Sequence, residues 1–204
     1  ISIYLIDRPG SPQSVLLGGH IATPKANPDE IATIAANDAV GGLFMSRINL
    51  NLREDKHWSY GARTGLVNAR GQRFFYAMTG VQSDKTKESI EEIMMELQDY
   101  IGDSPITDEE LSKSISNNTL SLPGRWETAG SVLGSLSQIV QYGLDDDYFN
   151  TFADDIRSLK TDEVARVGKQ LIHPNSLVWV VVGDRKMIEP GLNELGFGKV
   201  QVIN

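Results

Sequence analysis

Cysteine is absent from the 204-residue sequence, which excludes a disulfide framework, a cysteine-based zinc finger and an iron–sulfur site. Long hydrophobic runs are also missing. The longest one, Leu177–Val182, has the length of a strand, whereas a membrane-spanning helix needs roughly 18 apolar residues. The net charge is −8 and the Lys and Arg residues are scattered. A nucleic-acid partner is therefore not expected, because it requires a concentrated basic surface.

Histidine is scarce and occurs only as His20, His57 and His173. Zinc ligands on one helix face need two histidines at the spacing of H-x-x-E-H or its inverse, and these three are too far apart for that. We therefore expect no metal site in this chain and interpret each histidine as a surface or loop residue. The acidic run Asp145–Asp147 lacks the D-x-D-x-D-G spacing of a calcium loop, which favours a solvated loop.

Other motifs that carry chemistry are absent as well. The sequence contains neither of the glycine-rich nucleotide-binding motifs and no G-x-S-x-G element, which leaves nucleotide binding and serine hydrolase chemistry without support. A chain of this length buries about 70% of its unfolded surface and needs no disulfide or metal to fold. Since it starts at Ile1, we expect it to be a fragment or a processed product.

What is present is a strand-rich beginning, a long helical block and a return to strand. The hydrophobic patterns predict strands at residues 3–6, 13–22, 60–67, 73–81 and 200–203, with a hairpin connection at 68–72. The β-branched run Leu177–Val182 predicts a strand that is buried on both faces or central in a sheet.

Capping and breaking signals place the helices. Asn27 and Pro28 open a first helix, and a second is expected at 43–54, after Gly41 and Gly42. Ser83 is expected to cap the next helix, and Thr107–Glu110 forms a capping box. Further helices are predicted at 126–142, 147–159, from 161 to His173-Pro174, and at 187–195. Trp126 is interpreted either as a core residue at a helix start or as the lining of a groove.

This order of elements predicts an α+β fold. We expect a two-layer sandwich in which a mixed or mostly antiparallel sheet carries helices mainly on one face. The sequence shows no repeat, linker or low-complexity segment, so residues 1–204 are expected to form a single domain.

One stretch carries a recognisable motif. Val40–Gly61 has the sequence VGGLFMSRINLNLREDKHWSYG. It resembles the G-G-x-x-x-S-R-L-x-x-x-L-R-E-x-x-x-x-x-Y segment of the pitrilysin/insulinase-type zinc metallopeptidases, which include the mitochondrial-processing-peptidase group. In that family the segment belongs to the zinc-free, C-terminal-type domain. Departures are Ile48, where Leu is common, and His57-Trp58, where a Gly-Leu-type loop is usual.

The resemblance continues on both sides of this stretch. Residues 9–14, PGSPQS, resemble the family's strand entry, and Val180–Asp184, VVVGD, resembles its ending. Three such motifs in order cover nearly the whole chain. The resemblance implies the fold predicted above and a role as the non-zinc half of a metalloendopeptidase, so that this chain alone is predicted to be inactive.

The family's functional Arg and Tyr match Arg53 and Tyr60. By this resemblance Tyr60 would donate a hydrogen bond to the developing oxyanion, and Arg53 would anchor a substrate carbonyl or steady the same charge. Without the resemblance, Arg53 would simply meet the dipole of a helix C-terminus, and Tyr60 would be a half-buried packing residue with a wet hydroxyl.

The resemblance also implies a cofactor and partners. Zinc would be held by a homologous domain in the same polypeptide or in a partner subunit, and the substrate would be a peptide or an unfolded protein. The residues do not identify the compartment; the resemblance implies the bacterial periplasm or the cytoplasm, with the periplasm favoured on family grounds only. The alternative function is a structural or assembly subunit, as in respiratory-complex core proteins, or a peptide-binding module.

Overall fold

A six-stranded sheet runs through the computed structural model, which describes residues 1–203. Its order is β3-β4-β2-β5-β1-β6. β1 pairs in parallel with β5 and β6, and all other pairs are antiparallel. The predicted mixed sheet is confirmed, and it contains both the hairpin and the Leu177–Val182 run. The strands are β1 Ser2–Asp7, β2 Gln13–Ala22, β3 Ser59–Leu66, β4 Arg73–Gln82, β5 Val178–Gly183 and β6 Gln201–Ile203.

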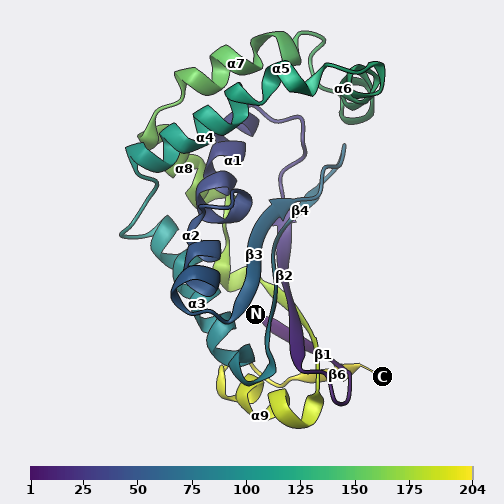
Figure 1. Cartoon of the computed structure of the whole chain (residues 1–204), viewed down its shortest axis with the longest axis vertical. Helices are drawn as coiled ribbons and strands as arrows, with labels where there is room; N and C mark the ends of the chain where they lie inside the picture. The colour runs from purple at the N-terminus through teal and green to yellow at the C-terminus, as the bar shows by residue number, and fades with distance from the viewer. Residues whose placement is uncertain (204) are drawn as a thin grey trace.

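The helices lie mainly on one side of the sheet, as Figure 1 shows. They are α1 Glu30–Asn37, α2 Arg47–Asn49, α3 Thr86–Ile101, α4 Asp108–Leu120, α5 Leu122–Arg125, α6 Ala129–Tyr142, α7 Tyr148–Ser158, α8 Thr161–Leu171 and α9 Arg185–Glu194. Two wide-turn π-helical segments, Asp38–Gly42 and Leu50–Asp55, extend α1 and α2, and short 3-10 turns occupy Ser83–Lys85 and Pro174–Ser176. The predicted α+β fold is confirmed. None of the helices within residues 1–203 has the length and apolar content that crossing a bilayer requires.

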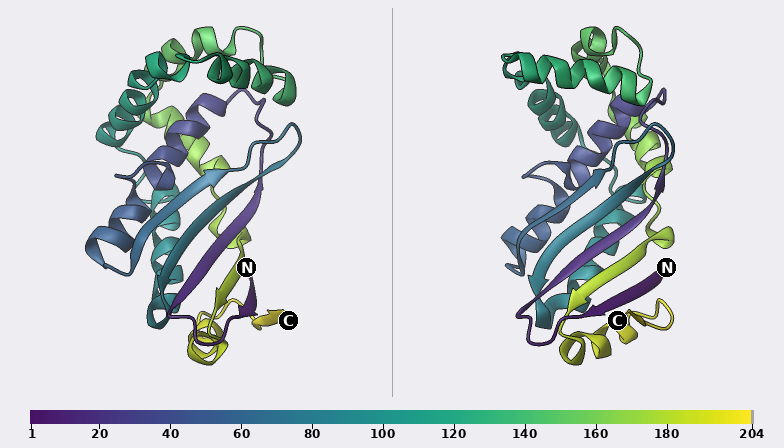
Figure 2. Two further views of the ribbon diagram at one scale, coloured as in Figure 1. Left: turned by 45° about the vertical axis from the view of Figure 1, so that its right-hand side comes forward. Right: turned by 90° about the vertical axis from the view of Figure 1, so that its right-hand side faces the viewer.

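The helical layer has two parts. α3 contacts β2 and β4, and α8 contacts both α1 and α3 beside the sheet. α4 and α7 pack on α1 and on each other. With α5 and α6 they form an arch beyond the end of the sheet, and α6 overhangs its other side (Figures 1 and 2).

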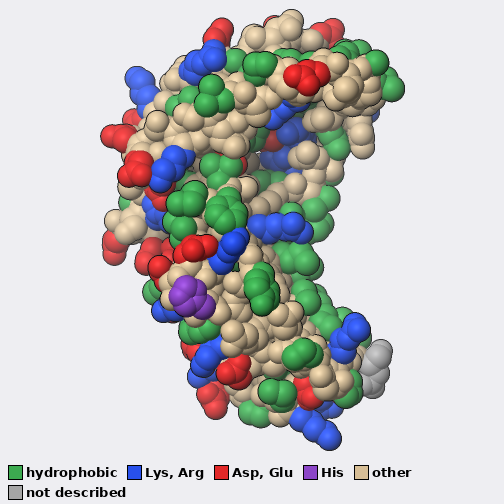
Figure 3. Space-filling view, viewed as in Figure 1, with side chains coloured by type: hydrophobic (Ala, Val, Ile, Leu, Met, Phe, Trp, Pro, Cys, Tyr) green, Lys and Arg blue, Asp and Glu red, His purple; other side chains and the backbone are tan. Residues whose placement is uncertain are grey.

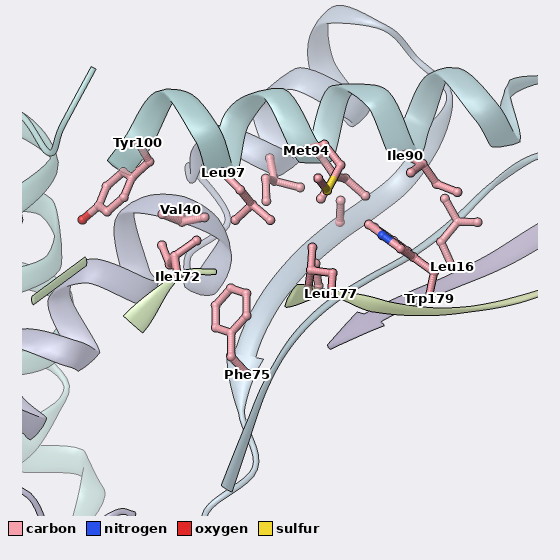
Figure 4. Close-up of a cluster of buried hydrophobic side chains, with 14 of the residues drawn as sticks. Leu16, Val40, Phe75, Ile90, Met94, Leu97, Tyr100, Ile172, Leu177 and Trp179 are labelled. Carbon is pink, nitrogen blue, oxygen red and sulfur yellow. The ribbon is translucent and has the colours of Figure 1, made fainter. Parts of the chain in front are cut away.

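The core lies between the sheet and the helices. Leu16, Phe75 and Trp179 come from three neighbouring strands and are completely buried. They point towards Ile90 and Leu97 of α3, as Figure 4 shows. Because successive side chains of a strand point to opposite faces of a sheet, every second residue of these strands enters this core.

The opposite face of the sheet is open. The right-hand view of Figure 2 looks onto this face, where no helix lies directly over the strands. Of the two alternatives predicted for β5, a central place in the sheet is confirmed, whereas burial on both faces does not apply, since Val178 is 44% exposed. On β2, β4 and β5 this face carries no charged residue; it consists of Gln13, Val15, Leu17, Gly19, Ile21, Phe74, Tyr76, Met78, Gly80, Gln82, Val178, Val180 and Val182.

Three predicted helix boundaries are corrected. The helix expected at 43–54 starts only at Arg47, because Leu43 and Ser46 both have extended backbone. Ser83 does not cap α3, since its hydroxyl donates to the Ser11 carbonyl instead. The helix expected from Trp126 starts at Ala129, with Thr128 as its N-cap.

The capping box of α4 is confirmed. The Thr107 hydroxyl accepts from the Glu110 N–H, and the Glu110 carboxylate accepts from the Thr107 N–H at 2.8 Å. These two reciprocal bonds satisfy donors that the first turn of a helix leaves free.

His20 is buried, contrary to its interpretation as a surface or loop residue. Its Nε2 accepts the His173 backbone N–H at 3.2 Å, so its Nδ1 carries the proton and donates to the Ile21 carbonyl at 3.0 Å. Burial lowers the pKa of the His20 imidazole, although the bond to the Ile21 carbonyl acts in the opposite direction. The folded protein therefore holds this ring neutral.

This neutral ring predicts a pH-dependent stability. In the unfolded chain His20 has the ordinary histidine pKa of about 6.5, so near and below this pH the unfolded chain binds a proton at His20 more readily than the folded chain. The free energy of unfolding should therefore fall as pH drops from about 7.5 to 5.5. Urea unfolding at these two values measures the effect. His20→Gln should flatten the slope, whereas the exposed His173→Gln should keep it. An unchanged slope in His20→Gln would contradict the prediction.

Candidate functional site

Tyr60 projects from a β-bulge at the start of β3. Ser59 pairs with Val81 and Ala62 pairs with Thr79, so β3 has one residue more than β4 at this point. The Ser59 hydroxyl fixes the bulge, since it accepts the Gly61 N–H at 3.0 Å and donates to the Gly80 carbonyl at 2.8 Å. A bulge re-aims a side chain, and Tyr60 is 89% exposed.

Arg53 lies in the last turn of the segment Leu50–Asp55. Its guanidinium stacks over the Phe44 ring, with Cζ 4.5 Å from the ring centroid, and its Nε is 3.2 Å from Glu54 Oε1. The aromatic ring and the carboxylate together restrict where the guanidinium can lie. The side chain keeps 38% of its surface exposed.

The helical segment that carries Arg53 ends at Asp55, and its C-cap Lys56 is followed by His57. This residue has φ of 58°, a left-handed conformation that glycine usually adopts after a helix. Trp58 N–H then donates to the Leu52 carbonyl at 3.0 Å and closes the helix end. His57 therefore takes a left-handed position that glycine usually fills, and the chain reaches β3 within a few residues.

Asn49 links the segment that contains Phe44 to strand β3. Its Nδ2 donates to the Phe44 carbonyl at 2.6 Å, and its Oδ1 accepts the Ala62 N–H at 3.0 Å. Sequence reasoning missed both Asn49 and Phe44, because no local pattern distinguishes an asparagine that bridges two distant segments. The role of Arg47 was missed as well: its guanidinium forms a two-pronged pair with Glu110, at 2.6 and 2.7 Å, and fixes α2 to α4.

Gly41 allows the segment Asp38–Gly42 to pack directly against β3. A Cβ at Gly41 would lie 2.5 Å from both the backbone nitrogen and Oγ1 of Thr64, so only glycine fits between α1 and β3. Gly41 therefore packs directly against this strand.

Gly41→Ala should therefore destabilise the protein by about 1–3 kcal/mol, because the methyl group meets backbone that cannot move freely. Gly71→Ala is the matched control, since a Cβ there has no neighbour within 4 Å. Denaturant unfolding of both variants checks the prediction. Equal midpoints for the two would show that β3 yields to the added methyl group.

Arg53 and Tyr60 border the same two surface hollows. The first has a volume of about 410 Å³ and extends from Gly41–Phe44 across Tyr60–Arg63 to Met78–Gly80. The second, of about 390 Å³, lies on the other side of the pair, towards His57 and Gln82. Figure 3 shows the hollowed right-hand side of the molecule, along which hydrophobic side chains follow the sheet. The two predicted residues thus share one exposed rim.

The histidines do not gather at this rim. Within residues 1–203, no group of three or more His, Cys, Asp or Glu side chains is placed to hold a metal ion. His20 and His173 face each other with ring centroids 5.2 Å apart, but His20 Nε2 is already hydrogen-bonded. His57 lies at the rim, with Nδ1 3.0 Å from the Arg53 carbonyl.

Trp126 lies away from Arg53 and Tyr60. It follows α5, and its indole N–H donates to the Ser135 hydroxyl at 2.9 Å. With Val132, Leu136 and Phe149 it lines a hollow of about 240 Å³ between α6 and α7. Trp126 therefore lines a groove and also packs on the small buried cluster of Leu122, Phe152 and Ile156, while its predicted place at a helix start is wrong.

The sequence itself matches a family model. Residues 2–118 match the model of the peptidase M16 inactive domain. The chain belongs to this family. The resemblance to a zinc-free, C-terminal-type domain of pitrilysin-like metallopeptidases is confirmed, and an inactive M16 domain is not by itself catalytic. No curated protein sequence matches the chain at a significant level.

Solved structures share the fold of this M16 domain. A peptidase M16 inactive domain from Pseudomonas fluorescens is 20% identical with a TM-score of 0.83, over 90% of this chain and 43% of that one. The periplasmic protease PqqL from Escherichia coli is 14% identical with a TM-score of 0.71, over 90% of this chain and 20% of that one. Complex III from Candida albicans contains a chain that is 12% identical with a TM-score of 0.72, over 95% of this chain and 49% of that one. This chain therefore spans less than half of each.

Proposed function

We propose that this chain is the non-zinc domain of a metalloendopeptidase and supplies substrate-binding and oxyanion-stabilising residues. The observation that carries the proposal is the shared rim, where Arg53 and Tyr60 border the same two hollows. Zinc, held by the partner domain, would lower the pKa of a bound water and polarise the scissile carbonyl. The residues of this chain would bind the peptide opposite that metal.

Tyr60 and Arg53 suit two different parts of this task. A phenol is a neutral donor, and no group within residues 1–203 accepts or donates a hydrogen bond at the exposed Tyr60 hydroxyl, which leaves it free for a developing oxyanion. Arg53 is a permanently charged fork that Phe44 holds in place. It would bind a substrate carbonyl or stabilise the same negative charge.

The partner in this proposal is a homologous zinc-carrying domain, in the same polypeptide or in another subunit. The chain spans 43% of the Pseudomonas fluorescens structure, which leaves room there for a second domain of similar size. The open face of β2, β4 and β5 has no charged residue. On α6, Leu133 and Val140 are 65% and 78% exposed. Such uncharged surfaces favour a chamber wall that a second domain and an unfolded peptide cover.

Two further parts of the proposal rest on individual relatives. We place the enzyme in the periplasm, supported by the fold shared with a periplasmic protease. An assembly or scaffold role is the second candidate, because the Candida albicans complex III chain shares the fold over 95% of this chain. The exposed rim with Arg53 and Tyr60 favours the peptidase.

Reconstitution tests the proposal. The purified chain should hold no stoichiometric zinc by elemental analysis and should cleave no peptide. Adding the zinc-carrying domain, expressed as a separate chain or joined to this one, should produce peptide cleavage that chelators abolish. Zinc in the chain alone that is lost in His20→Gln or His173→Gln, or no cleavage by the assembled domains, would contradict it.

A further inference from the structure

The hollow between Gly41–Phe44 and β3 has an unusual charge for this protein. Arg53 and Arg63 both line it, and no Asp or Glu does, although the whole chain has a net charge of −8. The other lining residues are uncharged. The hollow is therefore a local concentration of positive charge on an otherwise acidic protein.

The two arginines differ in how their charge is balanced. Arg53 has a carboxylate partner, with its Nε 3.2 Å from Glu54 Oε1. Arg63 takes part in no ion pair within residues 1–203, and its only side-chain contact of hydrogen-bond type is a weak one, from Nη2 to Met78 Sδ at 3.9 Å. Its guanidinium, with five N–H donors, is thus available to a ligand.

The position of Arg63 on β3 directs it to the open side of the sheet. It is paired with Met78, which is paired with Leu17, which in turn is paired with Val180. Paired residues in a sheet point to the same face. The side chains of Arg63, Met78, Leu17 and Val180 therefore lie side by side in one row on the open face. Tyr60 precedes Arg63 by three residues and borders the same hollow.

We propose that Arg63 is a specificity-determining residue that binds a carboxylate of the peptide substrate, with apolar substrate residues beside it on the sheet. The proposal rests on the proposed function, in which this rim binds peptide. A guanidinium binds a carboxylate with two parallel hydrogen bonds. The carboxylate is either that of an internal Asp or Glu or that of the peptide C-terminus, and both have the same chemistry.

The test is the binding of short fluorescent peptides to the intact chain, measured by anisotropy. Three amidated peptides differ only at one central residue, which is Glu, Gln or Lys between Leu and Val neighbours. A fourth peptide has the Gln sequence with a free C-terminus. We expect the Glu peptide, the free-acid peptide or both to bind about fivefold more tightly than the amidated Gln peptide. The preference should shrink as salt is added.

Substitutions assign this preference to Arg63. Arg63→Met keeps the apolar stem and should remove the preference without weakening the Gln peptide. Arg63→Glu should transfer the preference to the Lys peptide. Arg8→Met is the matched control. Arg8 is also exposed, it lies in the β1–β2 connection, and its replacement changes the net charge by the same amount. The Arg8→Met variant should retain the preference.

Three results would overturn the proposal: equal binding of all four peptides, no binding of any of them, or a carboxylate preference that survives in Arg63→Met. The measurement needs no turnover and no zinc domain. A failure of the catalytic role proposed for Tyr60 would appear in kcat alone, so the two failures are distinguishable.

Discussion

Tyr60→Phe is expected to lower kcat by about 10²–10³ in the enzyme assembled from both domains, the usual loss when one oxyanion donor is removed. KM should change little, because the hydrogen bond strengthens mainly in the transition state. Steady-state kinetics on a quenched fluorescent peptide measures both. Since Tyr60 is 89% exposed, the free energy of unfolding should change by less than about 0.5 kcal/mol.

Two variants complete this experiment. Tyr4→Phe removes a hydroxyl from the same open face, on β1, and should leave kcat unchanged. Arg53→Lys keeps the charge but loses the fork and its stacking on Phe44, so it should also reduce turnover. Full kcat in Tyr60→Phe, or loss of folding in its place, would make Tyr60 a structural residue and favour the scaffold role.

The sequence predicted the fold because it depends on local patterns, and the placement of Arg53 and Tyr60 on one rim is equally local. Strand and helix periodicity, the hairpin and the capping box of α4 are each read within a few residues. The seven-residue interval from Arg53 to Tyr60 is likewise short, spanning one helix end, one turn and one bulge. The chemical role of the two residues comes from the family resemblance alone and stays a prediction.

What the sequence could not predict depends on distant segments. Asn49 bridges Phe44 and Ala62, and Gly41 touches Thr64, and no local pattern marks these pairs. For a related reason, the sequence left open whether β5 is buried on both faces or only central in the sheet. An unbroken apolar run shows that both faces of a strand are apolar, but whether the second face is covered depends on distant segments, and no helix of the described residues lies directly over it (Figure 2).

The second large effect is expected at Glu30, a buried carboxylate with two buried cations. Arg73 donates to both of its oxygens, Lys25 donates at 3.1 Å and Asn27 donates at 3.0 Å. Glu30 and Arg73 are each 4% exposed and Lys25 is 8% exposed. Glu30→Gln keeps the shape but leaves both cations without an anion, which should cost about 3–5 kcal/mol of unfolding free energy. The melting temperature should fall by on the order of 10 °C.

The size of this loss depends on burial, which two further variants test. Asp154→Asn neutralises an exposed acid paired with Arg157 at 3.3 Å, and exposed pairs contribute less than about 1 kcal/mol. Adding Lys25→Met to Glu30→Gln removes one of the two unpaired cations and should recover part of the stability, so the two changes should not add. Circular-dichroism melts and urea unfolding of the three variants measure this. If Glu30→Gln costs no more than Asp154→Asn, water reaches the cluster, and the buried charges do not hold the start of α1 against β4.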